Sequence, residues 1–197
     1  MKVVLFGHTG MVGSRIATEL EQRGHAVVGA SRDTGADVTD AASVASITQD
    51  ADAVVSAVSA RGVAFTLADV ARSLVEGTRR AGVRRLVVVG GSSSLEVAPG
   101  VRLVDTPDFP DEYKAEAYQQ ADALDVYRGV EDLDWTYVSP GAYFHPGERT
   151  GRYRLGGDEL LVDENGTSEV TAEDFAIAIA DLLEQGGHER ERVTAAW

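Results

Sequence analysis

Short apolar segments alternate with longer amphipathic segments along this chain, and this alternation limits the folds that it can adopt. Each short segment is a nearly continuous apolar run, which is typical of parallel strands covered by helices on both faces. The segments that predict strands in this way are 2–6, 25–30, 52–58, 84–90 and 134–140. The pattern therefore predicts an α/β fold with a doubly wound parallel sheet.

The amphipathic segments predict helices at 11–24, 65–82, 111–130 and 171–187. Helices of this length between strands need right-handed crossovers, which keep the strands parallel. Two shorter segments complete the expected sheet. Residues 36–38 predict a brief third strand, and residues 192–197 predict a last one.

The 197 residues contain no internal repeat or low-complexity tract, and we expect a single domain over residues 1–197. Regular strand–helix units fill its first half, about residues 1–90. Two long irregular segments, about 91–112 and 141–170, follow strand ends, and the second contains a predicted hairpin around 152–162. Ligands of open α/β sheets bind beyond the carboxyl ends of the strands, so both segments are expected to form the substrate side.

Composition argues against several classes of function. The net charge is −14 at pH 7, so we expect no nucleic-acid partner. Cysteine is absent and the four histidines are scattered, so we expect no metal and no disulfide bond. No apolar stretch approaches the roughly 20 residues of a membrane span, which predicts no membrane partner. The simplest expectation is a cytoplasmic monomer or homodimer that acts on a small molecule.

Three glycines lie at every third position between the first predicted strand and the first predicted helix: Gly7, Gly10 and Gly13. Glycine costs conformational entropy, so each one needs a backbone reason. We expect Gly7 to make a tight turn, Gly10 to let a ligand approach the backbone, and Gly13 to let the helix pack on the strand. The alternative interpretation is a glycine-rich turn that binds nothing.

The start of this helix is suited to a diphosphate. Amides of a first helical turn lack acceptors within the helix, and the positive end of the helix dipole lies there. Thr9 adds a hydroxyl group where a phosphate oxygen would lie. The order of strand, glycine loop and helix therefore predicts a dinucleotide site with these contact residues: Gly7, Thr9, Gly10, Met11, Val12 and Gly13.

The G-x-x-G-x-x-G spacing resembles that of extended and atypical short-chain dehydrogenase/reductases. The resemblance covers nearly the whole chain and includes VVVGGSSSL at 87–95, LDWTYVSPGAYFHPGERTGRYRLGGD at 133–158 and TAEDFAIAIADLLE at 171–184. Within that family the chain is similar to the NADH-flavin reductase group, which is related to flavin/biliverdin-IXβ reductases and NmrA-like proteins. The resemblance implies a Rossmann-type domain that binds NAD(P)H.

Ser31 and Arg32 end the second predicted strand, where an NAD-preferring site would place an acid for the ribose hydroxyls. A bidentate pair between Arg32 and a 2′-phosphate would favour NADP(H) over NAD(H). Two alternatives stay open. Arg32 is an ordinary solvated arginine, or Asp33 takes the hydroxyl role because the strand ends later.

By the resemblance, further residues contact the rest of the coenzyme. Asp37 and Val38 match the pair that flanks the adenine. The stretch 57–60 matches the strand end beside the nicotinamide ribose, and its candidate contacts are Ala57, Val58 and Ser59.

Most short-chain reductases that act on carbonyls or alcohols carry Y-x-x-x-K, whose lysine lowers the pKa of a proton-donating tyrosine. The only lysines here are Lys2 and Lys114, and Lys114 directly follows Tyr113. A tyrosine near its ordinary pKa of about 10 is a poor proton shuttle at neutral pH. Hydride transfer to a flavin does not need that shuttle in the same way, because the flavin ring delocalises the charge.

By the resemblance, Ser93 is the candidate catalytic serine beside the nicotinamide, with Ser92 and Ser94 as adjacent registers. The alternative is a serine cluster that satisfies the turn backbone. Pro140 and Gly141 match the proline-led turn that packs near the nicotinamide.

Tyr143 is the second candidate catalytic residue, and it and Phe144 are candidates to stack on an acceptor. Aromatic residues that anchor a loop to the core are the alternative. Ala142 stands where flavin reductases carry a histidine, and His145 comes later, which leaves the proton source open. Three nearby cations would attract an anionic substrate or are simply solvated: Arg149, Arg152 and Arg154.

We therefore expect an enzyme that transfers hydride from NADPH to a flavin, a quinone or a similar flat conjugated acceptor. A flavin (FMN, FAD or riboflavin) would then be a substrate. One alternative is a non-catalytic, NADP(H)-sensing regulator of the NmrA-like kind. Another is a carbonyl reductase or isomerase with an atypical proton donor, such as Tyr143 or Ser93.

Overall fold

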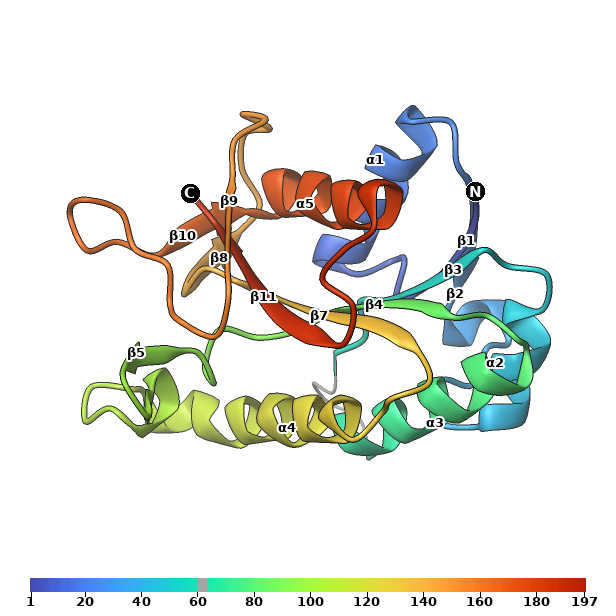
Figure 1. The fold of residues 1–197 in the computed structure, drawn as a ribbon, viewed down its shortest axis with the longest axis horizontal. Helices are drawn as coiled ribbons and strands as arrows, with labels where there is room; N and C mark the ends of the chain where they lie inside the picture. The colour runs from blue at the N-terminus through green and yellow to red at the C-terminus, as the bar shows by residue number, and fades with distance from the viewer. Residues whose placement is uncertain (60–63) are drawn as a thin grey trace.

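A seven-stranded sheet forms the middle of the computed structural model, which describes residues 1–59 and 64–197 (Figure 1). Its strands are β1 (Lys2–Phe6), β2 (Ala26–Ala30), β3 (Ala53–Ser56), β4 (Arg85–Val89), β7 (Asp134–Pro140), β9 (Arg154–Gly156) and β11 (Glu191–Ala196). Their order across the sheet is β2-β1-β3-β4-β7-β11-β9. Every neighbouring pair is parallel except β11 and β9.

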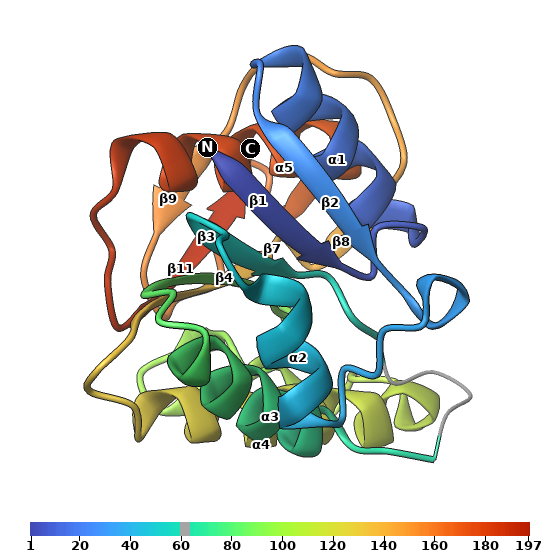
Figure 2. The ribbon, with the colours of Figure 1, turned by 90° about the vertical axis from the view of Figure 1, so that its right-hand side faces the viewer.

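Helices cover both faces of this sheet, as Figures 1 and 2 show. One face carries α1 (Met11–Gln22) and α5 (Ala172–Gln185). The other carries α2 (Ala41–Thr48), α3 (Leu67–Arg80) and α4 (Asp111–Arg128). The predicted α/β fold with a doubly wound, mostly parallel sheet is confirmed.

The first strand shows why its sequence is apolar without alternation. Val3 and Leu5 are buried in the core cluster below α1 and α5. Val4 and Phe6 point to the other face and are buried in the cluster with α3 and α4. Since successive side chains of a strand point to opposite faces, a strand covered on both sides needs apolar residues at every position.

The two long irregular segments form short strand pairs beside the main sheet. In the first segment, β5 (Glu96–Ala98) pairs antiparallel with β6 (Val101–Arg102). In the second, β8 (Tyr143–His145) pairs parallel with β10 (Glu169–Thr171). These pairs follow the carboxyl ends of β4 and β7, so they extend the edge of the sheet where ligands bind in α/β folds.

The prediction of a third strand at 36–38 is wrong. Asp37 Oδ1 accepts hydrogen bonds from the backbone N–H and the hydroxyl of Thr39, at 2.9 and 2.6 Å, and this turns the chain. Asp40 then caps α2 by accepting from the N–H groups of Ala42 and Ser43. The local carboxylate bonds compete with strand pairing, and they start a helix that the apolar pattern did not reveal.

The predicted hairpin around 152–162 is also wrong. Residues 154–156 form β9, but their partner is β11, with Leu155 opposite Ala195. The second half of the segment bonds to β5 instead, through Glu96 N to Asp158 O and Leu160 N to Glu96 O, at 2.9 and 2.8 Å. Both partners are distant in sequence, so the local pattern suggested the wrong pairing.

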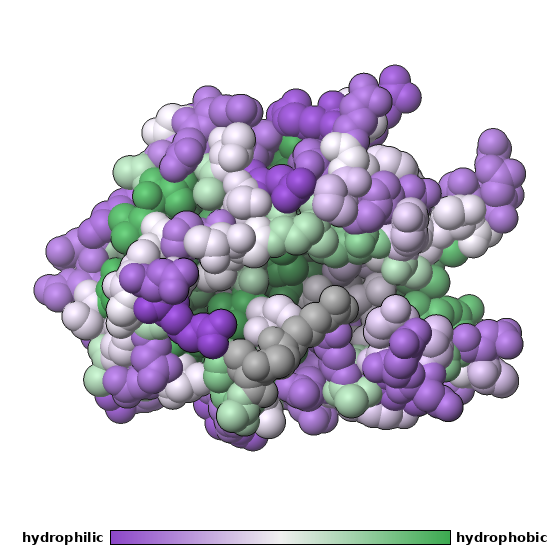
Figure 3. Space-filling view, turned by 180° about the vertical axis from the view of Figure 1, so that it is seen from behind, coloured by the Kyte–Doolittle hydropathy of each residue, from purple (hydrophilic) through white to green (hydrophobic). Residues whose placement is uncertain are grey.

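The last predicted strand and the four predicted helices form within a few residues of the expected bounds. Among the described residues, none of the helices has the length and apolar character that a membrane crossing requires. The space-filling view from behind shows apolar residues gathered around a hollow with a polar rim (Figure 3).

Phe175 of α5 is completely buried and packs on Phe144 of β8, with ring centroids 5.0 Å apart. We expect Phe175→Ala to lower the free energy of unfolding by about 3–5 kcal/mol, because it removes buried apolar area and leaves a cavity. Urea denaturation measures this change. The exposed Arg72→Ala is the control, expected to change it by no more than about 0.5 kcal/mol. A similar small change for Phe175→Ala would contradict the packing described.

Candidate functional site

The glycine loop after β1 exposes the amides at the start of α1. Gly7 has φ +79°, and its carbonyl accepts the N–H of Gly10 at 3.0 Å. Gly10 is the N-cap of α1, and the first bond of the helix runs from Ser14 N to Gly10 O at 3.0 Å. The N–H groups of residues 11–13 therefore have no acceptor within the helix. Such a helix end offers hydrogen-bond donors of the kind that phosphate groups accept from in other proteins.

The three glycines differ in the space around them. A Cβ on Gly7 would lie 2.5 Å from Ala57 O at the end of β3, and one on Gly13 would overlap Gly7 O. A Cβ on Gly10 would meet only Gly7 O, at 3.3 Å, and would otherwise point into open space. Gly7 and Gly13 thus let strand and helix pack, while Gly10 keeps the outer side of the loop open to a ligand.

A cavity of about 280 Å³ adjoins this loop at the carboxyl ends of β1, β2 and β3. Most of the predicted coenzyme residues line it: Gly7, Thr9, Gly10, Arg32, Asp37, Val38, Ala57, Val58 and Ser59. Ala60, the last residue of the 57–60 stretch, lies outside the described residues. The remaining coenzyme candidates do not line this cavity: Met11, Val12, Gly13 and Pro140.

Arg32 lies in a short 3-10 helix, Arg32–Thr34, at the end of β2, and its side chain is exposed. No described residue forms an ion pair with it, so its charge is available at the rim of the cavity. Asp33 is exposed and does not line the cavity. The two hydrogen bonds from Thr39 hold the pKa of Asp37 below its usual value, so this lining carboxylate stays charged.

Two buried polar atoms beside the loop have no hydrogen-bond partner among the described residues, namely Ser31 Oγ and His8 Nδ1. Ser31 lines the cavity, and the His8 ring lies so close to Gly29 that a Cβ there would be 2.5 Å from Cδ2. Buried polar groups are normally satisfied, and an incoming ligand is one way to satisfy them. The Ser31 hydroxyl in the lining and the open side of Gly10 are thus polar and spatial features suited to a dinucleotide, whereas His8 does not line the cavity.

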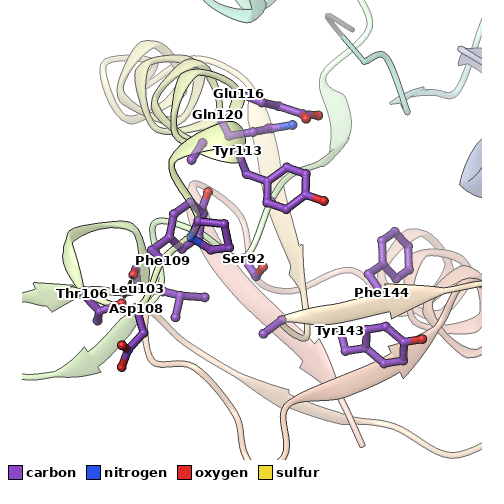
Figure 4. Close-up of a pocket in the computed structure, with 15 residues that line it drawn as sticks. Ser92, Leu103, Thr106, Asp108, Phe109, Tyr113, Glu116, Gln120, Tyr143 and Phe144 are labelled. Atoms are coloured by element: carbon purple, nitrogen blue, oxygen red, sulfur yellow. Dashed lines mark hydrogen bonds between the residues drawn. The ribbon is translucent and has the colours of Figure 1, made fainter.

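A second cavity, of about 640 Å³, lies beyond the carboxyl ends of β4 and β7 (Figure 4). Ser92 and Ser93 line it, whereas Ser94 does not. The Ser94 hydroxyl instead accepts a hydrogen bond from Arg192 of β11 at 2.9 Å. The three adjacent serines are thus divided between the cavity and the interior, and Ser93 is on the cavity side.

Tyr143 and Phe144 both line the second cavity from β8, as Figure 4 shows. Tyr143 is 61% exposed and lies over His145, with ring centroids 4.4 Å apart. Phe144 is half-buried and packs on Phe175 of the core. Phe144 therefore anchors β8 to the core, and Tyr143 is the aromatic ring that is open to a ligand.

His145 has acceptors at both ring nitrogens, Pro146 O at 2.8 Å and a Glu169 carboxylate oxygen at 2.7 Å. These two hydrogen bonds favour the doubly protonated ring and raise the pKa of His145 above its usual value. Both of its N–H groups point to protein oxygens, and the residue does not line the cavity. Ala142, which stands where flavin reductases carry a histidine, does line the cavity.

The three arginines of 149–154 are not gathered around the second cavity. Arg149 forms two hydrogen bonds of 2.9 Å to the carboxylate of Glu19 in α1, and Arg154 donates to the carbonyl oxygens of Val162 and Trp197. The bond from Arg149 is the main cause that holds the pKa of Glu19 below its usual value. At least two of the cations thus tie segments together.

Tyr113, the tyrosine that directly precedes Lys114 in the sequence, lies in the second cavity, whereas Lys114 does not line it. Tyr113 lines this cavity from the first turn of α4. Lys114 turns to Asp111, at 2.6 Å, which raises the pKa of Lys114 above its usual value. Among the described residues, no lysine lines either cavity. No lysine there is therefore placed to lower the pKa of a lining tyrosine.

The predicted substrate-side segment 91–112 contains Thr106, Asp108 and Phe109, which line the second cavity but were not predicted individually. No function was predicted for the face of α4 that adds Glu116 and Gln120 to the lining. The signal was present in the helix. Positions 113, 116, 117 and 120 follow the i, i+3, i+4, i+7 spacing of one helix face. Because this face holds polar and aromatic residues, the spacing did not predict a face that packs in the hydrophobic core.

Comparison with known proteins bears on this geometry. The model of a family described as NAD(P)H-binding matches residues 7–186. A solved structure from Burkholderia pseudomallei, described as a "putative exported protein", has 49% identity and a TM-score of 0.93, with both chains fully covered. The cytoplasmic location expected from the sequence therefore stays a prediction.

Two further solved structures are similar over the whole of this chain. A "putative epimerase" from Bacteroides thetaiotaomicron has 34% identity, a TM-score of 0.91 and 96% of its own chain covered. A "putative NADH-flavin reductase" from Streptococcus pneumoniae has 33% identity, a TM-score of 0.87 and 99% of its chain covered. The resemblance stated from the sequence is confirmed at the level of the NAD(P)H-binding family.

Substitution of the loop glycines should separate coenzyme binding from stability. We expect Gly10→Ala to lower the stability much less than Gly13→Ala, since its φ of −73° suits alanine and its Cβ meets only Gly7 O at 3.3 Å. We expect Gly10→Ala to weaken NADPH binding about tenfold or more. Gly13→Ala should unfold at lower urea concentration, because its Cβ overlaps Gly7 O. Calorimetry and urea denaturation measure the two effects. Equal NADPH affinity in Gly10→Ala and the wild type would contradict the loop assignment.

The hydrogen bonds of His145 predict a pH dependence. Because its pKa is raised in the folded state, the stability that it contributes is fully present below about pH 6.5 and is lost as the pH rises through the folded pKa. The difference in unfolding free energy between the wild type and His145→Phe should therefore shrink with rising pH. NMR titration of the imidazole checks the pKa, with Glu169→Gln expected to lower it. A folded pKa at or below 6.5 would refute the assignment.

Proposed function

The chain belongs to the NAD(P)H-binding family, and from this premise we propose that it transfers hydride from NADPH to a flavin, a quinone or another flat conjugated acceptor. The observation that carries the proposal is the second cavity, of about 640 Å³, which has four aromatic side chains in its lining. These are Phe109, Tyr113, Tyr143 and Phe144. Apolar and aromatic walls are suited to a flat ring that must lie in contact with a nicotinamide. The first cavity, of about 280 Å³ next to the glycine loop, is called the dinucleotide cavity from here on.

In this proposal the residues of the first cavity hold the coenzyme. The free N–H groups at the start of α1 bind its diphosphate, and Thr9 adds a hydroxyl beside it. Arg32 pairs with the 2′-phosphate, which is the reason to propose NADPH in preference to NADH. Asp37 and Val38 flank the adenine. Bound NADPH would supply the hydride, and the residues of the protein bind and orient the reacting groups.

The residues of the second cavity orient the acceptor. Ser93 is mostly buried at the carboxyl end of β4, where its hydroxyl is able to bond the nicotinamide carboxamide or the acceptor. Tyr143 offers an exposed ring for stacking and, with Phe144, shields the reacting groups from water. No proton shuttle of the tyrosine–lysine kind is assigned, since Lys114 is paired with Asp111. The proton that follows the hydride comes from solvent.

NADPH oxidation at 340 nm tests this function, with FMN, riboflavin and a naphthoquinone as acceptors. We expect turnover with at least one flat acceptor. Tight NADPH binding without turnover on a broad acceptor panel would favour a coenzyme-sensing regulator. Turnover of simple carbonyl compounds that is lost in Tyr143→Phe, with flavin turnover unchanged, would favour a carbonyl reductase.

Arg32→Ala tests the coenzyme preference. The variant removes a charge-assisted pair to the 2′-phosphate, so we expect the NADPH dissociation constant to rise about 10- to 100-fold and that of NADH to change little. Arg152→Ala is the matched control, since it removes the same charge from a side chain that lines neither cavity. Equal weakening of both coenzymes in Arg32→Ala would remove the argument for NADPH.

A further inference from the structure

Two adjacent glycines after β4, Gly90 and Gly91, are accounted for by two side chains that lie against them. A Cβ on Gly90 would overlap the ring of Tyr137 in β7. A Cβ on Gly91 would lie 3.1 Å from Cγ of Gln120 in α4. The glycine pair thus makes room for Tyr137 and Gln120, which meet behind the wall of the second cavity.

Tyr137 fixes the orientation of the Gln120 amide. Its hydroxyl lies 2.7 Å from Gln120 Oε1 and 3.1 Å from the Gln120 carbonyl oxygen. The single hydroxyl proton goes to Oε1, which is the nearer of the two oxygens. Tyr137 is 1% exposed, and burial raises its pKa far above the usual value, so the hydroxyl remains a donor. Oε1 therefore faces the interior.

The other end of the amide faces the cavity. Gln120 lines the second cavity together with Ser92 and Tyr113, and Figure 4 shows its nitrogen directed away from the helix axis into the open space. No described residue accepts a hydrogen bond from Nε2. Gln120 also borders a narrow void that it shares with Val58, and Val58 lines the dinucleotide cavity. Gln120 is thus linked through this void to one residue of the dinucleotide cavity.

We propose that Nε2 of Gln120 donates a hydrogen bond to a carbonyl oxygen of the acceptor, so that the site selects flat conjugated molecules that carry a carbonyl group. This inference rests on the proposed function. On reduction, a C–H bond of NADPH breaks and its electron pair leaves with the hydrogen to the acceptor. The acceptor gains one negative charge, which conjugation places largely on the carbonyl oxygen. Gln120 stabilises that charge without giving up a proton, and water then protonates the oxygen.

Binding of an oxidised acceptor in the absence of coenzyme is the primary test. Calorimetry with a naphthoquinone and with riboflavin should give dissociation constants about tenfold higher for Gln120→Met, which keeps length and neutrality but removes the donor. Gln120→Glu should weaken binding at least as much, because it replaces the donor with an acceptor. Gln119→Glu is the matched control on the same helix, since the Gln119 side chain accepts a bond from Leu67 N, a carboxylate keeps that bond, and Gln119 does not line the second cavity.

A positioning role of Tyr137 gives a second readout. Tyr137→Phe should also raise the acceptor dissociation constant, because it releases the amide to rotate. In the Gln120→Met background the same change should have no further effect, which a purely structural role would not produce. Infrared spectra should show a lowered carbonyl stretch for the bound naphthoquinone in the wild type and not in Gln120→Met. Urea denaturation confirms that each variant is folded.

The outcomes separate the inference from the function on which it rests. If the wild type binds and reduces an acceptor and Gln120→Met binds it equally well, the role of Gln120 is refuted and the proposed function stands. An unshifted carbonyl stretch in the wild type would refute it in the same way. If the wild type neither binds an acceptor nor oxidises NADPH with one, both are refuted.

Discussion

The close packing of α1 on the end of β1 is the constraint on which the rest of the site depends. It requires Gly7 to turn at positive φ and leaves no room for a side chain at Gly13. The turn also brings the loop against Ala57 at the end of β3. One backbone contact thus sets where the helix begins, where its unpaired amides point, and which neighbouring strand completes the wall of the cavity of about 280 Å³.

The parallel sheet then places the second cavity. Because β4 and β7 are neighbours and run in the same direction, the segments that follow them leave from the same edge. The first contributes Ser92 and Ser93, and the second contributes Tyr143 and Phe144. Helix α4, which connects the two strands, supplies the opposite wall through Tyr113 and Gln120 (Figure 4). Strand order therefore explains why residues distant in sequence meet around the second cavity.

The sequence revealed those features whose cause is local. The main strands are covered on both faces, so each is a continuous apolar run that the sequence shows directly. The glycine loop was predicted from the regular spacing of its glycines between a strand and a helix. The strand predicted at 36–38 does not form because the carboxylates of Asp37 and Asp40 accept hydrogen bonds from nearby residues. These bonds turn the chain and start α2. The false hairpin arose because β9 pairs with β11, a partner that no local pattern identifies. The role proposed for Gln120 was missed because it depends on Tyr137, which only the folded chain brings to it.

Phe144 belongs at once to the wall of the second cavity and to the packing of β8 on α5. Its ring packs on the ring of Phe175, which is completely buried. Variation inside the hydrophobic core at position 175 would therefore shift the cavity wall without altering any residue that a ligand touches. A substitution in the interior of the protein would in this way change the shape of the second cavity while every residue of its lining keeps its identity.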